Sequence, residues 1–157
     1  MTNNEILLIL GNQLFPIDYI KKTKVKKIFM SEDYNLANTH KHHKLKILMF
    51  FLAMRQYKDD LIKNGYEVYY HSIEDNDFKD PFESKFYKII KKYNIKNIKN
   101  FEIEDHFFEK QIHSFIKKIK INYETLSSPM FLSSRSEFKE FLLTQKKIIR
   151  MASFYQL

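Results

Sequence analysis

The chain contains no cysteine and no tryptophan, and its 157 residues include only two glycines and three prolines. Without cysteine there can be no disulfide framework, no iron–sulfur cluster and no zinc site with thiolate ligands. No stretch reaches the roughly 18 uninterrupted apolar residues that a membrane-spanning helix needs. The opening MTNNE lacks the basic segment and apolar core of a secretory signal. These absences predict a cytoplasmic protein.

Arginine is also scarce, whereas lysine is abundant. The chain has 24 lysines and 3 arginines, and its formal net charge is +8. A basic balance is typical of proteins that bind nucleic acid or another anionic surface. A lysine excess in a chain rich in Ile, Asn and Tyr is equally typical of an AT-rich genome, and specific phosphate or base recognition usually relies on arginine. The charge alone therefore leaves both interpretations open.

The apolar residues predict alternating strands and helices in one globular domain, because 44% of the residues are hydrophobic and the length can bury a substantial core. Short runs rich in β-forming residues predict strands at 5–10, 25–30, 66–73, 95–103 and 120–126. Helical spacing of apolar residues predicts helices at 43–64, 82–93 and 108–119. This alternation predicts an α/β fold: a Rossmann-like, doubly wound parallel sheet of about five strands with helices on both faces.

The turn after the first predicted strand is a candidate ligand site. The strand ends at Gly11, and the amides Asn12 and Gln13 follow. Ligands of open parallel sheets bind beyond the carboxyl ends of the strands, and glycine allows a tight turn and close approach. The segment is neither a GxGxxG motif nor a P-loop, so a plain dinucleotide site is disfavoured. The alternative is an ordinary turn between a strand and a helix.

Acidic and histidine-rich segments follow two other strands. Glu32 and Asp33 end the second strand, where a carboxylate can accept hydrogen bonds from a ribose or a ring N–H, or simply lie in solvent. The HKHHK segment, 40–44, lacks an acidic partner on one helix face, so we interpret it as the start of the long helix rather than as a metal site. Residues 104–106, Glu-Asp-His, suit a helix N-terminus better than an acid–base pair.

Catalytic motifs are missing from the sequence. Ser134 and Glu137 have the spacing of a capping box and predict the start of a helix. There is no GxSxG motif and no convincing Ser-His-Asp or paired-carboxylate arrangement. We therefore assign no catalytic residues and no metal ligands.

Five segments resemble, in order, a known family. They are LILGNQL (8–14), MSEDYNLANTHKHHKLKI (30–47), FFLAMRQYKDDLIKNGYEVYY (50–70), FLSSRSEF (131–138) and IIRMASFY (148–155). Each is similar to the corresponding stretch at the N-terminus of the deoxyribodipyrimidine photolyase-related proteins, which include the bacterial iron–sulfur photolyases and cryptochromes. The resemblance covers essentially the whole chain.

The resemblance implies an α/β antenna domain that binds a light-harvesting pigment, a lumazine-type chromophore. Carried over position by position, the binding residues are Gly11, Asn12, Gln13, Leu14, Glu32, His43 and Lys46. The turn residues would contact the pigment ring, and Glu32 would hydrogen-bond the ring or a ribityl chain. His43 and Lys46 would supply polar contacts at the helix entry. Arg135 and Arg150 are expected to position domains rather than to touch pigment.

The family's light-driven DNA repair or blue-light sensing resides in a larger helical domain that holds FAD and the iron–sulfur cluster. We expect residues 1–130 to form the antenna-type domain, and 131–157 to form a helix and the start of a linker to that absent domain. The chain alone is therefore not expected to catalyse repair. Its expected partners are a separately encoded FAD-binding helical domain and, through that domain, damaged DNA. The alternatives are a stand-alone small-molecule or nucleotide-binding module and a basic DNA-binding remnant.

Overall fold

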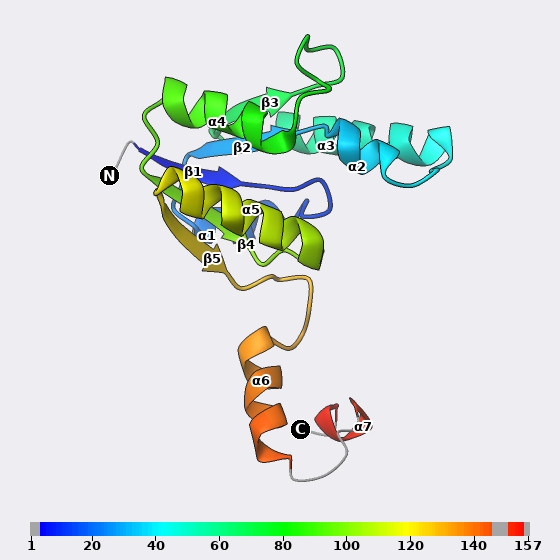
Figure 1. Cartoon of the computed structure of the whole chain (residues 1–157), viewed down its shortest axis with the longest axis vertical. Coiled ribbons are helices and arrows are strands. Elements are labelled where there is room, and N and C mark those ends of the chain that lie inside the picture. The colour runs from blue at the N-terminus through cyan, green and yellow to red at the C-terminus, as the bar shows by residue number, and fades with distance from the viewer. Residues whose placement is uncertain (1–3, 146–150, 156–157) are drawn as a thin grey trace. The chain divides into compact units, whose positions relative to one another are not determined.

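The computed structural model of the chain describes residues 4–145 and 151–155. Its contacts divide the chain into two compact units, Met1–Leu126 and Ser127–Leu157. The first unit is built on a sheet of five parallel strands in the order β3-β2-β1-β4-β5 (Figure 1). The strands are β1 (Glu5–Leu8), β2 (Lys27–Ser31), β3 (Glu67–His71), β4 (Asn97–Phe101) and β5 (Asn122–Leu126). The predicted doubly wound α/β fold is confirmed.

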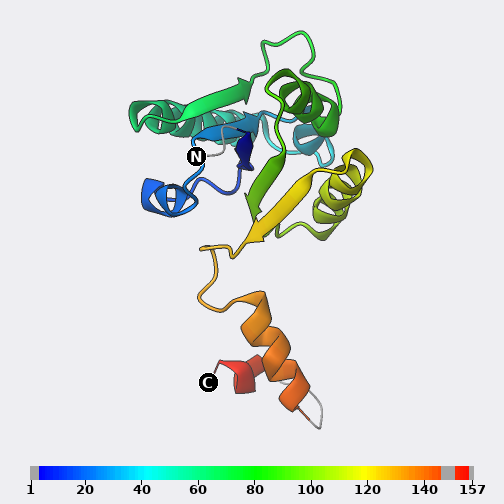
Figure 2. The ribbon, with the colours of Figure 1, turned by 90° about the vertical axis from the view of Figure 1, so that its left-hand side faces the viewer.

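Helices cover both faces of this sheet (Figure 2). α1 (Ile17–Lys22) and α3 (Lys44–Lys63) pack on one face, and α4 (Phe82–Lys92) and α5 (His106–Ile119) pack on the other. The short α2 (Tyr34–Asn38) lies between β2 and α3 in the chain. The second unit contains α6 (Arg135–Thr144) and α7 (Met151–Phe154).

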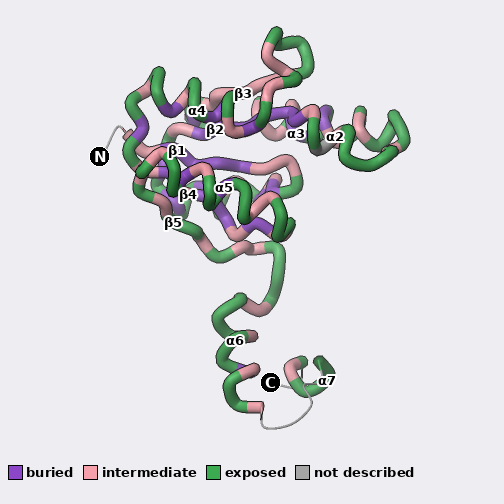
Figure 3. The backbone as a smooth tube through the Cα atoms, in the orientation of Figure 1, coloured by how far each residue is buried: buried purple, intermediate pink, exposed green. Residues whose placement is uncertain are grey.

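Alternation along the strands separates two hydrophobic cores. In β1, the side chains of Ile6 and Leu8 enter the core beneath α4 and α5, whereas Leu7 enters the core beneath α1 and α3. Successive strand residues point to opposite faces, so a strand covered on both sides must be apolar throughout. The buried backbone in Figure 3 accordingly runs through the central strands.

The helix boundaries follow the capping residues that the sequence predicts. His43 caps α3, Asp105 accepts a hydrogen bond from the Phe108 amide to cap α5, and Ser134 forms a complete capping box with Glu137 at α6. The pKa of Glu137 is lowered because its carboxylate accepts a hydrogen bond from the Ser134 backbone amide. These local patterns fix the starts of α3, α5 and α6.

One helix is apolar on its exposed side as well as on its packed side. Phe51, Met54 and Leu61 of α3 are buried against the sheet, as their spacing predicts. The first half of α3 also exposes a stripe of apolar side chains: Leu45, Leu48, Met49 and Leu52.

The second unit is held by aromatic contacts. The ring of Phe154 in α7 packs edge-on against Phe138, with centroids 5.0 Å apart, and lies 5.2 Å from that of Phe141. Large side chains around these rings stay exposed: Phe131, Leu132, Leu143, Met151 and Tyr155. Arg150, which we expected to position domains, lies outside the described residues.

Candidate functional site

The turn after β1 buries one of its two amides completely. Gln13 has no exposed surface, and its Nε2 donates a 2.8 Å hydrogen bond to the carbonyl oxygen of Glu102, which follows β4. Its Oε1 is buried and has no hydrogen-bond partner among the described residues. Asn12 is exposed and donates to the Glu104 carboxylate at 3.1 Å. The hydrogen bond to Glu102 connects the turn to the loop after β4. The unpartnered Oε1 is unusual, because buried polar atoms are nearly always hydrogen-bonded.

Gly11 is required by packing against α3. A Cβ atom at Gly11 would lie 2.6 Å from the ring of Phe50 and 2.8 Å from the Met54 sulfur. The residue does not adopt positive φ. Nearby, the Tyr57 hydroxyl donates a 2.6 Å hydrogen bond to the Phe15 carbonyl, and burial raises the pKa of that hydroxyl. The close approach of α3 therefore accounts for the glycine that ends the first apolar run.

Glu32, just beyond β2, is the centre of a buried hydrogen-bond network. Its side chain has no exposed surface. One oxygen accepts from Arg55 Nε at 2.6 Å and from the Tyr70 hydroxyl at 2.8 Å. The other accepts from Arg55 Nη2 at 3.0 Å and from the Ile73 amide at 2.7 Å. A carboxylate offers about four acceptor positions, so the chain itself satisfies Glu32 fully.

Arg55 extends this hydrogen-bond network from the buried Glu32 to the exposed Glu74. It forms a bidentate pair with Glu32 and also contacts Glu74, with Nη1 3.0 Å from a Glu74 oxygen. The hydrogen bond to Glu32 is the main cause of the raised pKa of Arg55. Burial, followed by the hydrogen bond to Glu32, raises the pKa of Tyr70. The guanidinium therefore stays charged and in a fixed orientation, about one-third exposed at this edge of the sheet.

A buried lysine ties α4 to the same edge. Lys85 has no exposed surface, and its ammonium donates to the Phe78 carbonyl at 3.2 Å and to the Glu32 carbonyl and an Asp33 oxygen at 3.4 Å. His71 at the end of β3 has its Nδ1 3.3 Å from Asp77, which lies in the loop before α4. Asp77 also accepts a 2.7 Å hydrogen bond from Lys88. That bond is the first cause of the lowered pKa of Asp77. The described residues hold no group of three or more His, Asp or Glu arranged to bind a metal.

The structure gathers some of the candidate residues and separates others. Gly11, Gln13 and Glu32 lie at the carboxyl ends of the adjacent strands β1 and β2. His43 and Lys46 lie at the exposed start of α3, where Lys46 Nζ is 3.5 Å from His42 Nδ1. No contact of either with Gln13 or Glu32 is observed.

Three residues of the site were not predicted from the sequence: Arg55, Tyr70 and Lys85. Arg55 is one of three arginines, and Tyr70 and Lys85 are separated from Glu32 by 38 and 53 positions. The rarity of arginine was the only available signal. Together these groups form a rigid polar edge with hydrogen-bonding side chains and a fixed guanidinium, an arrangement suited to holding a polar ring rather than to nucleophilic chemistry.

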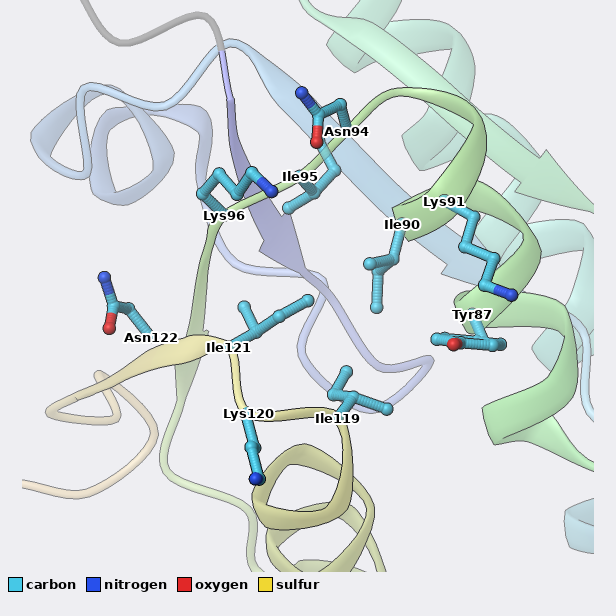
Figure 4. Close-up of a pocket in the computed structure, with 10 residues that line it drawn as sticks. All are labelled: Tyr87, Ile90, Lys91, Asn94, Ile95, Lys96, Ile119, Lys120, Ile121 and Asn122. Carbon is cyan, nitrogen blue, oxygen red and sulfur yellow. The ribbon is translucent and has the colours of Figure 1, made fainter.

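A groove of about 450 Å³ lies at the opposite, amino end of the sheet (Figure 4). It is bounded by the last turns of α4 and α5 and by the residues that lead into β4 and β5. Its lining residues are Tyr87, Ile90, Lys91, Asn94, Ile95, Lys96, Ile119, Lys120, Ile121 and Asn122. No carboxylate lines it.

In the part of the chain that the structure describes, no helix is long and apolar enough to cross a membrane.

Comparison with known proteins agrees with the fold and with the motifs. The family model of the deoxyribodipyrimidine photo-lyase-related proteins matches residues 7–157. A curated (6-4) photolyase from Agrobacterium fabrum strain C58 is 30% identical over 157 residues. The alignment covers 98% of this chain but only 31% of the relative. The chain therefore belongs to the deoxyribodipyrimidine photo-lyase-related protein family.

Proposed function

We propose that the carboxyl edge of the sheet binds a light-harvesting chromophore of the lumazine type, and that the chain serves as the antenna-binding part of a photolyase or cryptochrome. The observation that carries the proposal is the buried, unpartnered Oε1 of Gln13. It lies where ligands bind in open parallel sheets. The family membership of the chain supports the same interpretation.

Gln13 suits the proposed ligand because lumazine is a flat, neutral ring with carbonyl groups and an imide N–H. That N–H would donate to the free Oε1, while Nε2 stays bonded to Glu102 and keeps the side chain in place. Leu14, which is partly buried against the core, would pack on the ring. Gly11 and Asn12 would shape the turn, and His43 and Lys46 would add polar contacts from α3.

Glu32 acts in this proposal through its neighbours. Its acceptor positions are filled by Arg55, Tyr70 and the Ile73 amide, so it orients these groups around the site. The partly exposed Arg55 guanidinium is then the group available to a ligand carbonyl or a ribityl hydroxyl. A rigid site loses little side-chain conformational entropy when a ligand binds, so this fixed network would favour high affinity.

An absorbed photon needs an acceptor, so we propose that the chain works with a helical domain that holds FAD and the iron–sulfur cluster. Its DNA repair or light sensing would then depend on that partner. The chain spans 31% of the photolyase it matches. The second unit leaves several large apolar side chains exposed, including Phe131, Met151 and Tyr155, and such exposure is typical of a surface that a partner covers.

The experiment is an absorption and fluorescence titration of the purified full chain with a ribityllumazine. Gln13→Met removes the amide at nearly constant volume. Gln111→Met removes an exposed amide of α5 that bonds to Glu83, and so serves as the matched control. We expect at least a tenfold weaker affinity for Gln13→Met, because a lost buried hydrogen bond costs about 1.5 kcal/mol. The Gln111→Met variant should bind like the wild type.

The proposal fails if the wild-type chain leaves the ribityllumazine spectrum unchanged, or if the two variants bind it equally well. A stand-alone nucleotide-binding module would instead show saturable binding of a mononucleotide at the same edge. Competition between the two ligands, read from the chromophore fluorescence, separates these functions.

A further inference from the structure

Lysines gather at the amino end of the sheet. We use the name basic edge for the last four residues of α1, α3, α4 and α5, the loops that lead from them into the next strand, and the first residue of each strand. These segments contain twelve lysines: Lys21, Lys22, Lys24, Lys26, Lys27, Lys63, Lys91, Lys92, Lys96, Lys117, Lys118 and Lys120. They contain three acids: Glu5, Asp60 and Glu67.

The charge of the basic edge exceeds what the helices require. Each helix C-terminus carries roughly half a negative elementary charge, and lysines in the last turn offset it. Four helices end here, so about two of the nine excess positive charges are accounted for. Five of the lysines lie outside the helices, in the loops or on the first strand residue: Lys24, Lys26, Lys27, Lys96 and Lys120. The edge therefore retains a strong positive field.

Tyrosines hold several of these lysines in place. Lys22 Nζ lies 4.9 Å from the ring centre of Tyr19, and Lys91 Nζ lies 4.7 Å from that of Tyr87. Two further lysines of the edge, Lys27 and Lys92, lie over the ring of Tyr93. Contacts of this kind limit the freedom of the lysine stems while the ammonium groups stay available to solvent anions.

The groove between α4 and α5 gives this edge a concave centre. Ile90 and Ile95 are buried at its base, and exposed Lys91, Lys96 and Lys120 stand around its margin (Figure 4). No carboxylate lines the groove, so no lining residue forms an ion pair with these three lysines. The site fits a phosphate group that enters from outside rather than a buried apolar ligand.

We propose that the basic edge, centred on this groove, binds the phosphate backbone of double-stranded nucleic acid. The inference is independent of the chromophore site, which lies at the opposite end of the strands. Lysines spread over several loops match a ligand that presents many phosphates, and phosphate contacts carry no sequence information. Binding should therefore be insensitive to base sequence.

An anionic membrane fits the basic edge less well. Proteins that bind the membrane surface combine basic groups with a broad exposed apolar face. The exposed large apolar side chains among the described residues of these segments are Tyr19 and Ile62, whereas the isoleucines at the base of the groove are buried. The edge thus offers charge with little apolar anchoring.

The test measures binding of the full chain to a short fluorescent DNA duplex by anisotropy over a series of salt concentrations. The variant Lys91→Gln/Lys96→Gln/Lys120→Gln removes the three cations around the groove. The control Lys41→Gln/Lys79→Gln/Lys139→Gln removes three exposed lysines outside the basic edge, so both variants lose the same net charge. Circular dichroism melting confirms that both are folded.

We expect the groove variant to bind at least tenfold more weakly at low salt, and its plot of log affinity against log salt to be shallower by roughly 2 to 3 units, because each phosphate contact contributes about 0.9. The control should keep the wild-type slope, and two duplexes of unrelated sequence should bind equally.

Equal weakening of both variants would overturn the proposal, because bulk charge alone would then explain binding. It is also overturned if the wild-type chain does not bind the duplex. A third contrary outcome is a groove variant that loses affinity only for vesicles of phosphatidylcholine and phosphatidylserine, since the edge would then be a membrane contact. Ribityllumazine binding by the same variant reports on the chromophore site separately.

Discussion

The two ends of the parallel sheet accommodate charged side chains in different ways. At the carboxyl end, Glu32 and Lys85 have no exposed surface, and their charges are satisfied by neighbouring groups. At the amino end, Lys96 and Lys120 are exposed beside a groove without carboxylates. The helix dipoles favour the lysines at the amino end of the sheet, because positive charge is stabilised at helix C-termini. Burial then makes one end a rigid site and leaves the other a charged surface.

The largest effect should come from removing a buried carboxylate. Glu32→Ala leaves Arg55, Tyr70 and the Ile73 amide without their acceptor, and we expect the free energy of unfolding to fall by about 3 kcal/mol. This is the lower end of the range for broken buried pairs, because Arg55 is one-third exposed. Glu67→Ala, an exposed acid at the start of β3, should change it by less than about 0.5 kcal/mol. Urea unfolding measures both, and equal losses would show that burial does not distinguish the two ends.

Lysine substitutions make the same comparison for positive charge. Lys85→Met removes the donor to the Asp33 carboxylate and to two carbonyl oxygens, and should cost about 2 kcal/mol after allowing for the lysine's own desolvation. Lys96→Met, at the amino end, should stay within about 0.5 kcal/mol of the wild type. Thermal unfolding followed by circular dichroism gives the two values. If Lys96→Met were the more destabilising, Lys96 would be a structural residue rather than a surface charge.

The two glycines lie at opposite ends of the sheet, and alanine at each position should reduce stability for a different reason. Gly11→Ala should cost about 1–2 kcal/mol, because the new Cβ overlaps the ring of Phe50. Gly65→Ala should cost about 1 kcal/mol through backbone strain, because Gly65 has φ of 79° and open space around it. The added substitution Phe50→Leu should rescue part of the first loss and none of the second. Denaturant unfolding of the double variants decides this.

The smallest expected effect is a change in the free energy of unfolding at low pH. The Lys88 hydrogen bond lowers the pKa of Asp77 below its usual 3.8. The resulting stabilisation is complete above pH 3.8 and is lost as the pH falls through the lower value of the folded state. The stability difference between wild type and Lys88→Met should therefore be constant near neutral pH and shrink in strong acid. The difference for Lys96→Met should stay constant, and urea titrations at several pH values compare the two.

Much of the fold could be predicted because its signals are local. Apolar runs mark the strands, the spacing of Phe51, Met54 and Leu61 marks one face of α3, and Ser134 with Glu137 marks a helix start. The turn at Gln13 could be singled out because strand ends in parallel sheets bind ligands. Each of these inferences needs only neighbouring residues and a general rule.

The remainder depends on contacts between distant segments. Arg55 reaches Glu32 across 23 positions, and Lys85 reaches Asp33 across 52. No periodicity marks such a pair, and a lysine in an amphipathic helix is ordinarily exposed. The packing at Gly11 likewise depends on a distant segment, because a Cβ atom at this position would overlap the Phe50 ring.

The strand order also determines when β1 can pair with its second neighbour during synthesis. β1 precedes the other four strands of the sheet in the chain, yet it lies in the middle of the sheet and pairs with both β2 and β4. A ribosome adding 5–20 residues per second needs roughly 4–14 s to travel from β2 to β4. Throughout that interval one edge of β1 has no pairing partner. The central strand is therefore paired on both sides only after β4 has been translated, and the sheet is complete only after β5.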